Sequence, residues 1–166
     1  LGRRTCIMGV VNVTPDSFSD GGKFFARDAA VARGQKLAAD GADILDIGGE
    51  STRPFSDPVS VDEEIERVIP VIEKLAGQLT IPISIDTMKA EVARRAIEAG
   101  ASMINDVSAL RFDPDIGKVA SKFGTPVVLM HMLGSPKTMQ DSPTYDNLIA
   151  DISDFLKDAM ERAQKR

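Results

Sequence analysis

The chain has little cysteine and histidine, the residues that most often build disulfides and zinc sites. Cys6 and His131 are the only examples among 166 residues. One cysteine excludes an internal disulfide, and one histidine does not make a metal cluster. No nucleophilic cysteine or serine motif accompanies His131. We therefore interpret His131 as a satisfied histidine at a strand end rather than as a general acid–base.

Positive charge in excess, a secretory signal and a long apolar run are also missing. Lysine and arginine total 20 against 25 acidic residues, which gives a net charge of -5. This balance argues against a general nucleic-acid binder, although an acidic protein can still hold a locally positive site for an anion. With no membrane partner indicated, we expect small-molecule ligands and a reducing, cytoplasmic setting.

No phosphate-binding loop, GxGxxG motif or antiparallel hairpin signal is present, but one pattern repeats along the chain. An apolar strand is followed by a polar loop, an amphipathic helix and a glycine. The expected strands cover residues 7–11, 42–48, 82–85, 102–107 and 126–130. The expected helices cover 26–40, 61–76, 89–99, 114–123 and the residues from 146 onward. Five such units predict an α/β fold with an all-parallel sheet.

Local signals refine these elements. Ser60 and Glu63 form a capping box, and Asp113 precedes a proline at the first position of a helix. Pro70 is expected to kink or split the second helix. The first strand, Ile7 to Val11, is expected to be covered on both faces.

Two architectures fit a parallel sheet of this kind. One is a doubly wound sheet, and the other is part of a (β/α)₈ barrel, which typically needs about 250 residues. Periodicity does not choose between them, and both place function at the carboxyl ends of the strands. Residues 1–166 are expected to form a single domain. Because Leu1 is not methionine and the helical pattern continues to Arg166, we expect a piece of a longer protein.

A set of polar residues follows the predicted strands, each interrupting an apolar run at the same end. Buried polar groups are costly unless they are paired, so such a ring suggests a ligand or a mutual network. The set comprises Asn12, Asp16, Asp20, Glu50, Ser51, Thr52, Arg53, Asp86, Thr87, Asn105, Asp106 and His131.

The first two loops offer groups for a metal and a phosphate. Asn12 and Asp20 are oxygen donors suited to Mg²⁺ with phosphate oxygens, or else they belong to an Asx-turn and helix-capping loop. Arg53 offers a planar fork for phosphate and Thr52 adds a hydroxyl. The alternative for Arg53 is a surface side chain in a mobile loop.

Asp86 and Asn105 end consecutive predicted strands. A carboxylate accepts N–H donors and an amide both donates and accepts, so the pair suits a flat heterocycle with amino and ring N–H groups. The alternative is that Asp86 or Thr87 caps the next helix.

Five stretches resemble the dihydropteroate synthases, a pterin-binding barrel family. They are NVTPDSFSDGG (12–22), GADILDIGGESTRP (41–54), SIDT (84–87), INDV (104–107), and LMHM (129–132) with PKTMQ (136–140). The resemblance covers essentially the whole chain. It implies a (β/α)₈ TIM barrel of folate biosynthesis, here with five βα units. It also implies the joining of 4-aminobenzoate to 6-hydroxymethyl-7,8-dihydropterin diphosphate with release of diphosphate.

The resemblance also implies a role for each matching residue. Asp86 and Asn105 would hold the pterin ring, with Val107 and Met130 lining its pocket. Asn12 would contact Mg²⁺ and diphosphate, joined by Asp20 when the first loop closes. Thr52 and Arg53 would bind diphosphate or order the second loop, and Phe18 and Pro54 would flank 4-aminobenzoate. Asn12, Asp20 and Arg53 would be catalytic, and a homodimer of the family type would be the assembly.

The chain departs from the family in its length. The later strands of the family supply another aspartate and a lysine to pterin, and an arginine and a histidine to diphosphate, and none has a position here. The alternatives are therefore a pterin-dependent methyltransferase of the same superfamily, acting with a corrinoid partner, and a non-catalytic pterin-binding barrel fragment.

Overall fold

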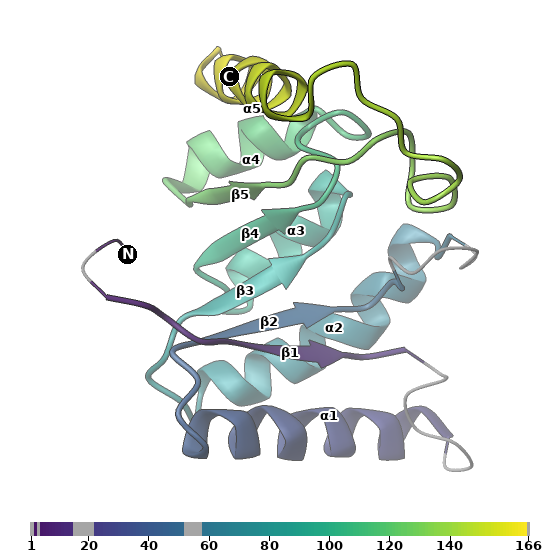
Figure 1. Cartoon of the computed structure of the whole chain (residues 1–166). Coiled ribbons are helices and arrows are strands. Elements are labelled where there is room, and N and C mark those ends of the chain that lie inside the picture. Colours follow the sequence, from purple (N-terminus) through teal and green to yellow (C-terminus); the bar gives the residue numbers. More distant parts are fainter. Residues whose placement is uncertain (1, 3, 15–21, 52–57, 166) are drawn as a thin grey trace.

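Strands and helices alternate along the whole described chain in the computed structural model, which describes residues 2, 4–14, 22–51 and 58–165 (Figure 1). The strands are β1 (Met8–Asn12), β2 (Ile44–Gly48), β3 (Ile83–Asp86), β4 (Met103–Asp106) and β5 (Val127–Leu129). The helices are α1 (Gly22–Ala39), α2 (Val61–Ala76), α3 (Ala90–Glu98), α4 (Asp115–Phe123) and α5 (Leu148–Gln164). The five predicted strand–helix units are confirmed, with α1 beginning four residues earlier than expected.

The order of the strands identifies the architecture. All neighbouring strands pair in parallel, and the sheet runs β1-β2-β3-β4-β5 without a reversal. A doubly wound sheet reverses its strand order at a switch point, whereas a barrel keeps sequential order. In Figure 1 helices α2 and α3 lie behind the sheet and α1 lies below β1; α1 packs against α2, α2 against α3, and α3 against α4. The fold is therefore a five-strand arc of an α/β barrel.

The core lies between the sheet and these helices. Side chains of alternate strand residues point into it, and Leu45, Ile47, Ile85 and Ile104 are fully buried there. Each buried aliphatic side chain of this size contributes about 1.5–3 kcal/mol relative to exposure. This layer fixes the rotation of the strands, and so decides which residues face the opposite, concave side of the sheet.

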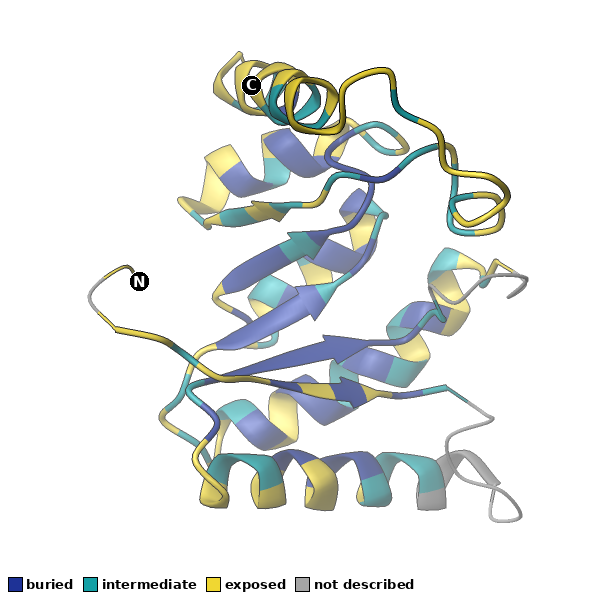
Figure 2. Cartoon of the chain, viewed as in Figure 1, coloured by how far each residue is buried: buried dark blue, intermediate teal, exposed yellow. Residues whose placement is uncertain are grey.

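The first strand differs from the prediction. Alternate residues of β1 are exposed, with Val10 at 51% of its maximum, whereas Val11 faces the helices and is buried. Figure 2 shows the contrast with the buried central strands. The expected cover on both faces is wrong, because β1 is an edge of the described sheet and only the helical layer covers it.

The proline in α2 does not split the helix, so the expected split is wrong. Pro70 lies inside the continuous helix Val61–Ala76. Because proline has no N–H, it leaves the carbonyl of Glu66 without its usual helical donor. Arg27 of α1 donates from Nη2 to this oxygen at 2.9 Å. The side chain of one helix thus replaces the missing backbone bond of its neighbour.

The predicted helix ends are mostly confirmed. The Ser60 hydroxyl accepts from the Glu63 N–H at 3.2 Å, while the Glu63 carboxylate pairs with Arg67. Pro114 rather than Asp113 is the N-cap of α4, one residue later than expected, although Asp113 still accepts from the N–H of Asp115. No helix in the described part of the chain is long and apolar enough to span a bilayer.

Candidate functional site

A row of side chains crosses the sheet at the carboxyl ends of its strands. The register aligns Asn12 of β1 with Gly48 of β2, Gly48 with Asp86 of β3, and Asp86 with Asn105 of β4. Residues aligned in a parallel sheet point to the same face. These positions therefore share the concave face, opposite the helical layer, and the structure brings together Asp86 and Asn105 as predicted.

Gly48 leaves the room that this row needs. A Cβ atom at this position would lie 3.3 Å from Asp86 Oδ2 and 3.4 Å from Asp86 Cβ. The 3.3 Å contact is tighter than ordinary van der Waals packing, so the Asp86 carboxylate would have to shift. The missing side chain keeps the space beside the Asp86 carboxylate open for another group.

Asp46 is a member of the site that the sequence interpretation missed. It lies in the middle of β2 and is only 4% exposed. Its Oδ2 accepts a hydrogen bond from Asn105 Nδ2 at 2.9 Å. The available signal was an acid within the apolar stretch ILDIG, where an unpaired charge would be costly.

Two carboxylate oxygens in this group have no partner among the described residues. Asp46 Oδ1 and Asp86 Oδ1 are both buried and accept no hydrogen bond there. A buried acceptor without a donor costs about 1–3 kcal/mol. Both oxygens are therefore ready to accept from a ligand that carries N–H groups.

The environment of Asp86 disfavours its charge. Burial raises its pKa to about 7, and the negative charges of Asp46, Glu64, Asp106 and Glu50 add to the effect. A buried carboxyl with a pKa near neutral is a candidate functional group, although structural networks also produce such values. Supplying N–H donors to Asp86 would stabilise its ionised form.

The alternative role of Asp86 as a helix cap is wrong. The first backbone N–H of α3, at Ala90, donates instead to Asp113 Oδ2 at 2.7 Å. Thr87 takes the local role, since its hydroxyl accepts from the N–H of Lys89 at 3.3 Å. The helix start is thus satisfied without Asp86.

Asp106 is structural. Its carboxylate is fully buried and accepts from the N–H groups of Ser108 at 2.8 Å and Leu110 at 2.7 Å. These bonds hold a turn in which Ala109 and Leu110 have φ values of 53° and 62°, a left-handed conformation that such residues rarely adopt. Of the two polar side chains that end β4, Asn105 and Asp106, only that of Asn105 faces the concave side.

A cluster of charged side chains joins the segment after β2 to α2 and to the start of α3. Lys89 Nζ binds a Glu50 carboxylate oxygen and lies 2.5 Å from Glu64 Oε2. Glu64 is fully buried, and burial raises its pKa. Burial alone would lower the pKa of Lys89, but its bonds to Glu50 and Glu64 raise it overall. The cluster therefore fastens the end of β2 to the starts of α2 and α3.

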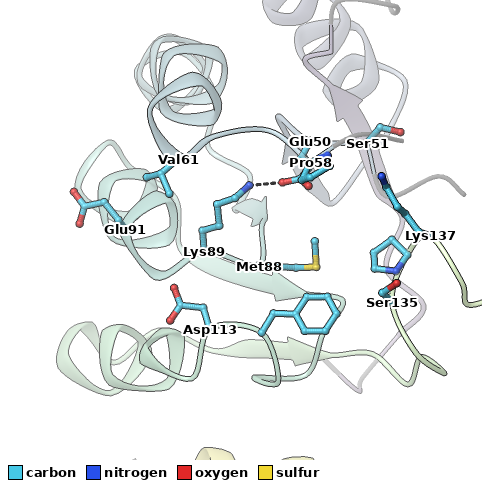
Figure 3. A pocket seen from close by; sticks show the side chains of 12 residues that line it. Glu50, Ser51, Pro58, Val61, Met88, Lys89, Glu91, Asp113, Ser135 and Lys137 are labelled. Carbon is cyan, nitrogen blue, oxygen red and sulfur yellow. Dashed lines mark hydrogen bonds and ion pairs between the residues drawn. The ribbon is translucent and has the colours of Figure 1, made fainter. Parts of the chain in front are cut away.

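A cavity of about 540 Å³ opens beside this cluster (Figure 3). Lys89 and Glu50 meet at its wall, while Ser135 and Lys137 approach from the loop after β5. Asp86 and Asn105 do not line it. Its lining residues are Glu50, Ser51, Pro58, Val61, Met88, Lys89, Glu91, Phe112, Asp113, Ser135, Pro136 and Lys137.

The residues that follow β4 and β5 differ in exposure and in the side chains that they contact. Val107 is buried and Met130 is 37% exposed. The ring of His131 lies 4.8 Å from that of Phe155 and 5.8 Å from that of Tyr145, between centroids. His131 thus packs against two aromatic rings, and the expectation of a satisfied histidine rather than a general acid–base stays a prediction.

The predicted loop residues and the metal remain predictions. Phe18, Asp20, Thr52, Arg53 and Pro54 lie outside the described residues. Asn12 is exposed at the end of β1, where an amide oxygen can reach a cation that also holds waters and phosphate oxygens. No group of three histidine, cysteine, aspartate or glutamate side chains suited to a metal occurs within residues 2, 4–14, 22–51 and 58–165.

Residues 8–166 match the pterin binding enzyme family. The chain belongs to this family. It is 48% identical over 163 residues to a dihydropteroate synthase of Synechocystis, a match that covers 98% of this chain and 56% of the relative.

Solved structures of the family share the fold. A Xanthomonas albilineans dihydropteroate synthase with 4-aminobenzoic acid has 52% identity and a TM-score of 0.89, covering 98% of this chain and 57% of that one. The same enzyme in complex with 7,8-dihydropteroate has 48% identity and a TM-score of 0.84 over 98% of this chain and 56% of that one. The chain thus spans little more than half the length of the relatives that it matches.

Proposed function

We propose that the chain works in the dihydropteroate synthase reaction, in which 4-aminobenzoate displaces diphosphate from 6-hydroxymethyl-7,8-dihydropterin diphosphate. The observation that carries this proposal is the pairing of Asp86 with Asn105 across β3 and β4, with a buried carboxylate oxygen awaiting a donor. The solved structures of one relative with 4-aminobenzoic acid and with 7,8-dihydropteroate support the choice of ligands.

The proposed role of the described residues is to bind and orient the pterin. Ionised Asp86 accepts N–H groups of the ring, and the Asn105 amide offers both a donor and an acceptor beside it. Val107 and Met130 supply apolar surface near the ends of the neighbouring strands. Holding the ring in one orientation aligns its methylene carbon with the incoming amine, which lowers the entropic part of the barrier.

The remaining roles concern the diphosphate and the aminobenzoate. We propose Asn12 and Asp20 as ligands to Mg²⁺, and Thr52 and Arg53 as diphosphate contacts, with Phe18 and Pro54 beside the aminobenzoate ring. When bound, Mg²⁺ would neutralise charge on the departing diphosphate. Arg53 would bind its oxygens through a planar fork of donors. The amine of 4-aminobenzoate is itself a nucleophile, so the scheme requires no general base. A cytoplasmic location and a family-type homodimer remain predictions.

Two measurements on this chain test the proposal. Calorimetry with 6-hydroxymethylpterin should give saturable binding, and Asp86→Ala should weaken it by about 1–3 kcal/mol. The chain is then incubated with both substrates and Mg²⁺, and chromatography tests whether dihydropteroate has formed. The matched control is Asp154→Ala on α5, an exposed aspartate paired with Lys157.

The outcomes separate three readings. Binding with product formation supports a synthase, and binding without product supports a non-catalytic pterin-binding arc. Absence of binding in a folded chain, or equal affinities of the Asp86→Ala and wild-type chains, would contradict the pterin site.

A further inference from the structure

The hydrogen bond between the buried Asp46 and the side chain of Asn105 determines which way the Asn105 amide is oriented. Asp46 Oδ2 lies 2.9 Å from Asn105 Nδ2. An ionised carboxylate has only acceptors, whereas an amide has a donor side and an acceptor side. The NH₂ group of Asn105 must therefore be the part that faces Asp46.

This contact uses only part of the hydrogen-bonding capacity of the Asn105 amide. One N–H is bound to Asp46, so the second N–H and the carbonyl oxygen are left for other partners. Without Asp46 the amide could rotate by half a turn and exchange its donor and acceptor. With Asp46 present, the rotated form would place two acceptor oxygens against each other in a buried site, which is unfavourable.

Asp46 is held in place by the sheet itself. It lies one residue pair below the row of Asn12, Gly48 and Asp86, in register with Val10 on one side and Ser84 on the other. Strand backbone on both sides and an exposure of only 4% leave it little freedom. An orienting group on a paired central strand is more rigid than one on a loop.

We propose that Asp46 is a positioning residue that locks the amide of Asn105 in one orientation and thereby sets which edge of a heterocycle the site accepts. This inference rests on the proposed pterin site and adds a determinant of its specificity. The locked amide favours a ring edge on which a donor and an acceptor stand in one fixed order, as in a 2-aminopyrimidine. An edge with a carbonyl in place of the amino group would meet a mismatched partner.

The first test needs no ligand. In the ¹⁵N-labelled chain, one side-chain amide proton of Asn105 should exchange with solvent about tenfold more slowly than in Asp46→Asn. The control is Ser84→Ala, which changes a buried neighbour in register with Asp46 but removes no charge and should leave the exchange unchanged. If the Asp46→Asn chain does not fold, the wild type alone decides, because equal and rapid exchange of both Asn105 protons would overturn the inference.

The second test measures selectivity. Affinities for pterin and for lumazine, which carries an oxo group where pterin carries the 2-amino group, are compared by calorimetry. The wild-type chain should prefer pterin by at least about tenfold, because a mismatched edge leaves buried polar groups unpaired. In Asp46→Asn the preference should fall several-fold, since a neutral amide can pair with either orientation of Asn105. In Ser84→Ala the preference for pterin over lumazine should be unchanged.

The two tests fail separately. If the wild type binds neither pteridine, the proposed pterin site fails, and the exchange experiment still decides whether Asp46 orients Asn105. If pterin binds but Asp46→Asn keeps both the slow exchange and the full preference, the positioning role is overturned and the proposed function stands.

Discussion

Replacing Asp86 with asparagine should stabilise the folded chain, and the gain should grow with pH. The pKa of Asp86 is raised from 3.8 to about 7, chiefly by burial. A carboxyl with a raised folded-state pKa stabilises the fold below its unfolded pKa, and this contribution is lost as pH rises through the folded pKa. The wild-type chain should therefore lose stability between about pH 4 and pH 7.

The magnitude follows from the size of the shift. A difference of about three pKa units corresponds to about 4 kcal/mol. Asparagine has nearly the same shape and carries no charge. The advantage of Asp86→Asn over wild type should thus rise from near zero at pH 4 to about 4 kcal/mol at pH 8. The acidic groups that act on Asp86 are Asp46, Glu64, Asp106 and Glu50, and Lys89 pairs with the two glutamates.

Urea unfolding at one-unit intervals from pH 4 to pH 8 provides the assay, with Asp154→Asn as the control for an exposed aspartate. The midpoint difference between Asp86→Asn and wild type should widen with pH, while that of Asp154→Asn stays small. A difference that is constant across the range would refute the argument. The same variant should bind pterin about 1–3 kcal/mol more weakly, so stability and binding would change in opposite directions.

Three further changes test other parts of the site. Lys89→Met should destabilise the chain by about 3–5 kcal/mol in urea unfolding, because it leaves the buried carboxylate of Glu64 without its cation; a loss below about 1 kcal/mol would contradict the cluster. Asp106→Ala should cost about 2–3 kcal/mol in the same assay, since two backbone N–H groups lose their acceptor, and an unchanged midpoint would exclude this role. Gly48→Ala should weaken pterin binding about tenfold by calorimetry with the fold retained, because its Cβ would stand 3.3 Å from Asp86 Oδ2; wild-type affinity would show that this space is not used.

The repeating pattern of the sequence was enough to predict the secondary structure and the edge that carries the site. Strand and helix periodicities are local, so the five units could be found from the spacing of apolar residues. Asp86 and Asn105 could be found because each ends an apolar run, and parallel strands bring such ends to one edge. Periodicity did not choose between a doubly wound sheet and a barrel, a choice that the motif resemblance favoured and the strand order decided.

Errors in the sequence interpretation arose where a distant neighbour decides the outcome. Pro70 satisfies the usual rule for a helix break, but Arg27 of another helix supplies the missing donor. The first strand looks like a strand buried on both sides, but its neighbours cover only one face. Neither outcome can be predicted from the residues that are near these positions in the sequence.

The sequence alone thus determined which residues are polar at the ends of the strands, because hydrophobic alternation and turn residues act within a few positions. Only the tertiary structure decided what each polar residue does. Asp46 and Asn105 are 59 positions apart and Lys89 and Glu64 are 25 apart, yet each pair is in hydrogen-bond contact. The physical reason is that burial and charge act through space, so the pKa of Asp86 and the orientation of Asn105 depend on neighbours that the sheet register brings together.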